Sequence, residues 1–149
     1  MINHKNIFGS FCLDLSYSTT RIVTYEMPNI VNSMDFKYQT LLRLPEGSHR
    51  KDWGGLRSQN LYKKSFSDKP LITVITVVYN GEKYLENTIQ SVLDQAYDNI
   101  EYIIIDGGSS DGTIDIIKKY EAQIDYWVSE CDSGISDAFN KGISLATGD

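Results

Sequence analysis

Tyr79, Asn80 and Asp106 are the side chains of this 149-residue chain whose types and positions could do chemistry together. Tyr79 ends an apolar run that starts at Leu71, and Asn80 follows it. Asp106 closes a second apolar run, Ile100–Ile105. An aromatic ring can pack on a nucleobase, and a carboxylate can accept hydrogen bonds from base or ribose donors. At a shared sheet edge, these side chains could hold a nucleoside.

The segments around these residues predict a strand, a helix and a second strand. Short apolar, β-branched runs are typical of strands that are buried on both faces. The segment between the runs has one apolar stripe at helical spacing, formed by Leu85, Ile89, Val92, Leu93 and Ala96. Asn80 can cap this helix, and Glu82 suits its first turn. A helix between two strands predicts a parallel pair with a right-handed crossover, and ligands bind at the carboxyl ends of such strands.

Three further elements are predicted after Asp106. Asp111 can cap a second helix that reaches Tyr120. The run Ile124–Ser129 predicts a third strand. Apolar residues between 135 and 146 then recur at helical spacing, and Gly148 is a plausible stop for that helix. Strands that alternate with helices in this way indicate an α/β fold.

Three sequence pieces, in this order, resemble the start of a family 2 glycosyltransferase, an inverting family with the GT-A nucleotide-sugar fold. They are Val78-Tyr79-Asn80, Ser91-Val92-Leu93-Asp94-Gln95 and Asp106-Gly107-Gly108-Ser109-Ser110-Asp111-Gly112-Thr113. Residues 132–142 are similar to a subfamily form, Asp-x-Gly-Ile-x-Asp-Ala-x-Asn-Lys-Gly. The resemblance covers the second half of the chain. It implies a Rossmann-like, mostly parallel sheet flanked by helices, the fold of nucleotide-diphospho-sugar transferases, incomplete at its C-terminus.

The resemblance also implies a set of nucleotide-binding residues: Val77, Tyr79, Asn80, Glu82, Asp106 and Lys141. Asp106 leads this set, because the acid at this strand end in the family holds the base, usually uracil. Gly107 stands where many members have a second acid, and Phe139 replaces the usual arginine, so Lys141 is the candidate for the diphosphate.

Each of these assignments has a simpler structural alternative. Asp106 and Asn80 could merely cap a turn or a helix. Tyr79 could be an aromatic residue of the core or rim, and Glu82 a solvated carboxylate. Lys141 could be a plain surface charge on its helix. Asp111 is expected to be a cap rather than a ligand.

The function implied by the resemblance is sugar transfer from a nucleotide-sugar donor, typically a UDP-sugar, to a polysaccharide or lipid-linked acceptor. Family members use a divalent metal, Mn²⁺ or Mg²⁺, held by an Asp-x-Asp motif on a later strand. Neither that motif nor a candidate catalytic base follows in this sequence. We therefore expect residues 70–149 to be the N-terminal nucleotide-binding part of a glycosyltransferase domain, inactive alone. The alternative is a non-enzymatic nucleotide-binding remnant or interaction module.

Composition narrows the remaining functions. A net charge of -6 and a pI near 4.8 argue against a nucleic-acid binder, whose footprint would be basic. A phosphate-bearing ligand stays compatible, because backbone amides can hold phosphate. Cys12 and Cys131 are expected to be reduced thiols, with a disulfide between them left open. No run is long enough for a membrane span, so we expect a cytoplasmic protein, compatible with peripheral membrane association.

Residues 1–69 give weaker signals and are interpreted as an N-terminal extension of uncertain structure. Arg21–Tyr25 predicts one short strand. The piece Trp53-Gly54-Gly55-Leu56-Arg57 is interpreted as a loop that packs its tryptophan and leaves its charges in solvent. The alternative is a contact to a phosphate or a sugar.

Overall fold

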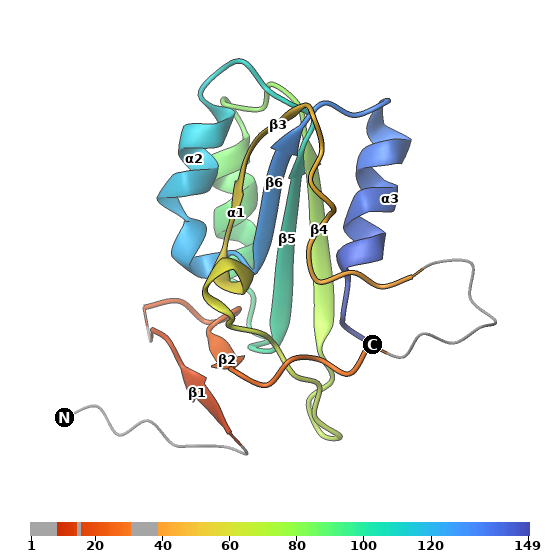
Figure 1. The fold of residues 1–149 in the computed structure, drawn as a ribbon. Helices are drawn as coiled ribbons and strands as arrows, with labels where there is room; N and C mark the ends of the chain where they lie inside the picture. Colours follow the sequence, from red (N-terminus) through yellow and green to blue (C-terminus); the bar gives the residue numbers. More distant parts are fainter. Residues whose placement is uncertain (1–8, 15, 31–38) are drawn as a thin grey trace.

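A central sheet of four strands forms the middle layer of the molecule (Figure 1). The computed structural model describes residues 9–14, 16–30 and 39–149. In spatial order the strands are β3 (Arg50–Gly54), β6 (Tyr126–Glu130), β5 (Ile100–Asp106) and β4 (Ile72–Val78). A separate two-stranded ribbon, β1 (Ser10–Cys12) with β2 (Ile22–Thr24), lies at the amino ends of the central strands (Figure 1).

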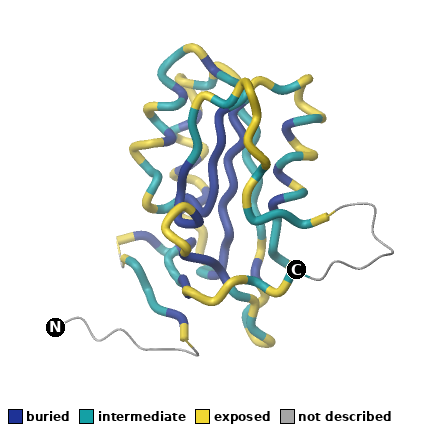
Figure 2. The backbone as a smooth tube through the Cα atoms, viewed as in Figure 1, coloured by how far each residue is buried: buried dark blue, intermediate teal, exposed yellow. Residues whose placement is uncertain are grey.

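Strands β4, β5 and β6 are parallel, as the helical connections require. The register pairs Val78 of β4 with Asp106 of β5, and Asp106 with Ser129 of β6. All seven residues of β5 are buried (Figure 2), which explains its continuous apolar run. The predicted parallel pair is therefore confirmed, and its carboxyl ends lie side by side.

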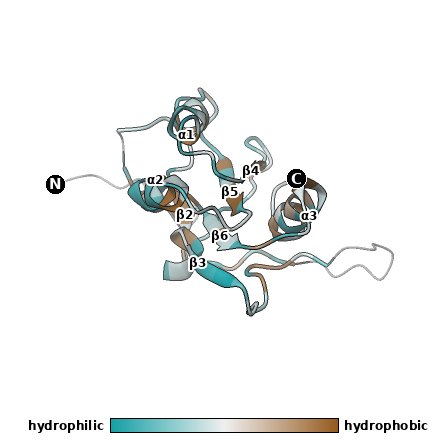
Figure 3. Cartoon of the chain, turned by 90° about the horizontal axis from the view of Figure 1, so that it is seen from above, coloured by the Kyte–Doolittle hydropathy of each residue, from teal (hydrophilic) through white to brown (hydrophobic). Residues whose placement is uncertain are grey.

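Helices cover both faces of the sheet (Figures 1 and 3). Helices α1 (Leu85–Leu93) and α2 (Thr113–Lys119) lie on one face, and α3 (Ile135–Leu145) lies on the other. The side chains of β5 alternate between them, because successive residues of a strand point to opposite faces. Tyr102 and Ile104 join the core under α1 and α2, whereas Ile103 and Ile105 join the core under α3. The α/β class is confirmed.

Several predicted boundaries are wrong by a few residues. Helix α1 starts at Leu85 with Tyr84 at its N-cap, so Asn80 does not cap it. Asn80 instead adopts a left-handed conformation, with φ 48°, which asparagine tolerates better than most residues. Helix α3 ends at Leu145 because Ala146 is extended, and Gly148 is therefore not its stop. The N–H of Gly148 donates to Thr73 Oγ1 at 3.0 Å.

The N-terminal half contributes to the main sheet as well as to the small ribbon. Strand β2 confirms the short strand predicted at residues 21–25. Strand β3 was not predicted, because the segment Arg50–Gly54 is polar and lacks an apolar alternation. It pairs antiparallel with β6 and covers that edge of the sheet. Two short 3₁₀ turns, Leu56–Gln59 and Glu121–Gln123, complete this side of the molecule.

Two buried ion pairs join the N-terminal half to the family-like half. Arg57 lies 2.5 Å from Glu101, and each side chain is 1% exposed. Arg57 also donates to the carbonyl of Leu145 at 2.9 Å. Lys63 lies 3.8 Å from Asp125, again with both side chains 1% exposed. The expectation of solvated charges at residues 53–57 is wrong for Arg57, and its burial also removes it from contact with a phosphate.

Trp53 is half-buried and packs on Tyr126, with ring centroids 6.1 Å apart, as expected for a packed tryptophan. Cys12 and Cys131 are both free thiols. Among the described residues, no helix is long and apolar enough to cross a membrane.

Candidate functional site

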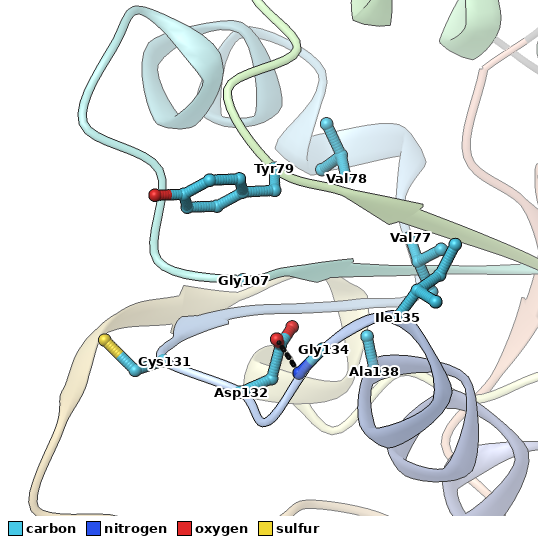
Figure 4. A pocket seen from close by; sticks show the side chains of 9 residues that line it. All are labelled: Val77, Val78, Tyr79, Gly107, Cys131, Asp132, Gly134, Ile135 and Ala138. Carbon is cyan, nitrogen blue, oxygen red and sulfur yellow. Dashed lines mark hydrogen bonds between the residues drawn. The ribbon is translucent and has the colours of Figure 1, made fainter.

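A pocket of about 500 Å³ opens at the carboxyl ends of the parallel strands (Figure 4). This volume is typical of small-molecule sites. Strand β4, the turn after β5, the loop after β6 and the start of α3 supply its lining: Val77, Val78, Tyr79, Gly107, Cys131, Asp132, Gly134, Ile135 and Ala138. The pocket therefore lies at the edge of the sheet that the topology predicts for a ligand.

Gly107 separates the two side chains best suited to hold a heterocycle. Tyr79 leaves the end of β4 with 68% of its surface exposed, and its ring stands to one side of Gly107 (Figure 4). The carboxylate of Asp132 stands to the other side. A Cβ atom at residue 107 would lie 2.8 Å from Asp132 Oδ2 and 3.4 Å from Tyr79 Cδ2. The glycine therefore keeps open the space between ring and carboxylate.

Asp132 is positioned by the turn that starts α3. Its Oδ1 atom accepts a hydrogen bond of 2.8 Å from the N–H of Gly134, while its Oδ2 atom faces Gly107. Gly134 has φ 109°, a conformation that strongly favours glycine. The exposed side chain of Ile135 and the buried Ala138 add an apolar wall. A ring, an apolar wall and one carboxylate can together bind a planar heterocycle that carries hydrogen-bond donors.

The carboxylate of Asp106 points into the protein and does not line this pocket. The residue is 0% exposed. Its Oδ2 atom accepts hydrogen bonds from the N–H of Ser109 at 3.0 Å and from the hydroxyl of Ser129 at 2.6 Å. The hydroxyl of Ser109 donates to Oδ1. In this structure Asp106 has the capping role that was its alternative, and its contact with a base stays a prediction.

Asn80 and Glu82 hold the loop that follows β5. Asn80 Oδ1 accepts from the N–H of Ser110 at 2.9 Å. Glu82 Oε2 accepts from the N–H of Gly112 at 3.1 Å, so Glu82 is exposed but not merely solvated. Neither side chain lines the pocket.

Asp111 does not occupy the N-cap position of α2, which is Gly112, but its carboxylate accepts a hydrogen bond from a backbone amide at the start of that helix. Its Oδ1 atom accepts from the N–H of Thr113 at 3.0 Å, and its Oδ2 atom from the N–H of Glu82 at 3.1 Å. The hydrogen bond from the Thr113 hydroxyl is the main reason why the pKa of Asp111 lies below its usual range. The residue therefore stays charged at the start of α2.

Lys141 is paired with carboxylates at the side of the pocket. Its Nζ atom lies 3.0 Å from Glu130 and 3.3 Å from Asp137. Partial burial works to lower the pKa of Lys141, but the hydrogen bonds and charges of Glu130 and Asp137 outweigh it and raise that pKa. Lys141 is therefore a charged, ion-paired group rather than a plain surface charge, and it does not line the pocket.

The structure thus divides the six predicted nucleotide-binding residues. Val77 and Tyr79 line the pocket, whereas the other four stand beside or beneath it. Asp132 is the pocket carboxylate that the sequence analysis did not assign. Its signal was present, because it opens the Asp-x-Gly-Ile segment similar to the subfamily form. That segment was interpreted through Lys141 alone.

A divalent metal finds no ready site among residues 9–14, 16–30 and 39–149. These ranges contain no group of three or more His, Cys, Asp or Glu side chains arranged to hold an ion. Asp106 is occupied by two serines and Asp111 by backbone amides. The described residues therefore do not fit the expected metal.

Comparison with known proteins decides the family. A sequence model of glycosyl transferase family 2 matches residues 73–149, just over half of the chain.

The chain belongs to glycosyltransferase family 2.

Relatives of this chain come from several bacteria. A Bacillus subtilis (strain 168) protein named for teichuronic acid biosynthesis, TuaG, is 45% identical over 83 residues, which cover 54% of this chain and 33% of the relative. The uncharacterized glycosyltransferase Rv1514c of Mycobacterium tuberculosis (strain ATCC 25618 / H37Rv) is 43% identical over 54% of this chain and 31% of its own length. Glycosyltransferase GlyA of Streptococcus pneumoniae serotype 4 is 35% identical over 52% of this chain and 11% of its own.

The chain spans about a third of the length of the first two relatives. The comparisons therefore show membership of the family. The donor, the acceptor and the activity of this chain belong to the proposal that follows.

Proposed function

We propose that the pocket beside Tyr79 binds the nucleotide of a nucleotide-sugar donor, in particular a UDP-sugar. The observation that carries this proposal is the arrangement of Tyr79, Gly107 and Asp132 at the carboxyl ends of β4, β5 and β6. The ring offers a face for the base, and Asp132 Oδ2 offers an acceptor for a donor group on that base. The pocket volume of about 500 Å³ suits a ligand of this size.

The reaction proposed for the whole protein is sugar transfer to a polysaccharide or lipid-linked acceptor in the cytoplasm. An acceptor hydroxyl oxygen attacks the anomeric carbon of the sugar, and the bond from that carbon to the diphosphate breaks. The hydroxyl proton passes to a base, and the nucleoside diphosphate leaves with the bonding electrons. We assign the described residues to binding of the donor only, because none of them is identified as the base.

Calorimetry with UDP tests the binding part of the proposal. The wild-type chain is expected to bind UDP, and Tyr79→Ala is expected to weaken that binding by about 1–3 kcal/mol, the usual value of a base stacked on an aromatic ring. Because Tyr79 is 68% exposed, its loss should leave the fold intact.

Tyr25→Ala is the matched control, because Tyr25 is also 68% exposed and follows strand β2, outside the pocket lining. This variant should bind UDP like the wild-type chain. A folded wild-type chain that binds neither UDP nor a UDP-sugar would refute the proposal. An equal loss of UDP affinity in the two variants would show that the binding site does not lie at Tyr79.

A further inference from the structure

Lys51 reaches from strand β3 to the turn that forms one side of the pocket. Its Nζ atom donates hydrogen bonds to the carbonyl oxygens of Gly108 and Ser109, at 2.8 Å and 2.9 Å. These are charge-assisted bonds, which are stronger than bonds between neutral groups. A residue from outside the family-matched range therefore holds the turn next to Gly107.

The backbone of β3 is irregular at Lys51. Arg50 pairs with Glu130, but Asp52 pairs with Ser129, so β3 contains one more residue than β6 across this step. Lys51 is that extra residue, the mark of a β-bulge. Bulges redirect a side chain out of the regular alternation of a strand, and they are enriched beside active sites. The bulge thus accounts for the reach of Lys51 toward the turn.

The two neighbours of Lys51 anchor the bulge on both sides. Arg50 donates two hydrogen bonds to Glu130 Oε2, at 3.0 Å and 2.9 Å. Asp52 pairs with Lys118 of α2 at 2.5 Å. The bulge is therefore fixed to β6 on one side and to the helix after the turn on the other, which gives Lys51 a defined position.

The turn is held from both sides once Lys51 is included. From within, Asp106 accepts from the N–H of Ser109, and Asn80 accepts from the N–H of Ser110. From outside, Lys51 binds the carbonyls of Gly108 and Ser109. Gly108 has φ 85°, so the backbone bends sharply at the point that Lys51 secures.

We propose that Lys51 is a positioning residue for nucleotide binding, because it fixes the Gly107–Ser110 turn that shapes the pocket. This inference rests on the proposed function for the identity of the ligand. It adds that the N-terminal half of the chain tunes the affinity of a site whose lining lies entirely in the family-matched half.

The test combines UDP calorimetry with backbone amide exchange in the nucleotide-free 149-residue chain. Lys51→Met should raise the Kd for UDP by roughly three- to tenfold, the effect of losing a typical hydrogen bond. It should also speed exchange at the amides of Ser109 and Ser110. Lys51→Arg should largely restore both, because a guanidinium can donate to both carbonyls.

Lys69→Met is the matched control, since Lys69 forms a partly exposed ion pair with Asp98, at 2.8 Å, at the opposite end of the sheet. It should change neither the Kd nor exchange at the turn. If the wild-type chain binds UDP and Lys51→Met binds it as tightly as Lys69→Met and the wild type do, Lys51 is not a positioning residue and the inference is overturned. If the wild-type chain binds no UDP, the proposed function fails, and exchange at Ser109 and Ser110 alone decides whether Lys51 positions the turn.

Discussion

Gly107 sets the width of the pocket at the carboxyl ends of the parallel strands. A side chain at position 107 would reduce the space in the pocket, because a Cβ atom there would lie within contact distance of Asp132 and Tyr79. The carboxylate beside Gly107 comes from Asp132, which lies on a different loop. The residue types at the strand ends predicted a carboxylate in the site, but they pointed to Asp106, whereas Asp132 lines the pocket.

Gly107→Ala is expected to weaken UDP binding and to leave the fold intact. An added methyl group in a packed site costs about 1–3 kcal/mol, and Asp132 Oδ2 would have to move from a contact of 2.8 Å. Calorimetry measures the loss. Gly47→Ala is the control, because its added Cβ would meet only the flexible end of Glu130, at 3.4 Å, away from the pocket lining. Equal UDP affinity in the Gly107 variant and the wild type would contradict the role of Gly107.

The roles of single side chains were predicted less well than their positions in the chain. Asp106 was expected at a strand end and is found there, but its carboxylate turns inward to Ser109 and Ser129. Those serines are close only in the folded state, and the orientation of one side chain depends on such partners. Arg57 was misjudged for the same reason, because its partner Glu101 lies 44 residues away.

The elements themselves follow more directly from the sequence. Strands β4 and β5 are continuous apolar runs, and α1 and α3 carry apolar stripes, so each has a local signal. Strand β3 has no such signal, because it is held by pairing with the distant β6. Its neighbour β6 begins beside the second buried ion pair, between Asp125 and Lys63, which also had no local signal.

The burial of Asp125 is expected to make the stability of the sheet depend on pH. Burial is the main cause that raises the pKa of Asp125 to about 7, although the charge of Lys63 opposes the rise. In the unfolded chain the carboxyl has its ordinary pKa near 3.9. Between these values the folded state holds a proton that the unfolded state has released. The free energy of unfolding should therefore fall as the pH rises from about 4 to about 7, with no further loss from this group above that range.

Urea unfolding at several pH values between 4 and 8 checks this expectation. Asp125→Asn should remove the fall attributable to this carboxyl, and Lys63→Met should extend it to higher pH, because the opposing charge is gone. The comparison with wild type isolates Asp125 from other groups that titrate in the same range. Parallel stability curves for the wild type and Asp125→Asn would contradict the account.

At the scale of the whole molecule, the N-terminal half is joined to the family-matched half by buried charge and by backbone pairing. Arg57 and Lys63 supply the buried cations for Glu101 and Asp125, and β3 covers the edge of β6. A domain boundary at residue 70 was predicted because the family pattern begins there, and it stays a prediction. Because buried contacts join the residues on the two sides of position 70, removing residues 1–69 tests this boundary directly.

A chain that starts at Pro70 is expected not to fold stably. Its buried Glu101 and Asp125 would lose their cations, and breaking one buried pair costs about 3–5 kcal/mol, against a total stability of about 5–15 kcal/mol for a domain. Circular dichroism and urea unfolding measure the result. A chain that starts at Gly9 is the control, because it keeps every described element. Cooperative unfolding of the shorter chain at wild-type urea concentrations would show that the two halves are independent.

The most direct test of the central claim is an NMR titration of the isotope-labelled 149-residue chain with UDP. The account predicts saturable shifts that concentrate on the backbone amides of Tyr79, Gly107, Asp132 and Gly134, at the carboxyl ends of β4, β5 and β6. Amides at the opposite end of the sheet, such as Ile72 and Ile100, should stay unchanged. Shifts that concentrate elsewhere, or no shifts in a folded chain, would contradict the claim that this pocket is the nucleotide site.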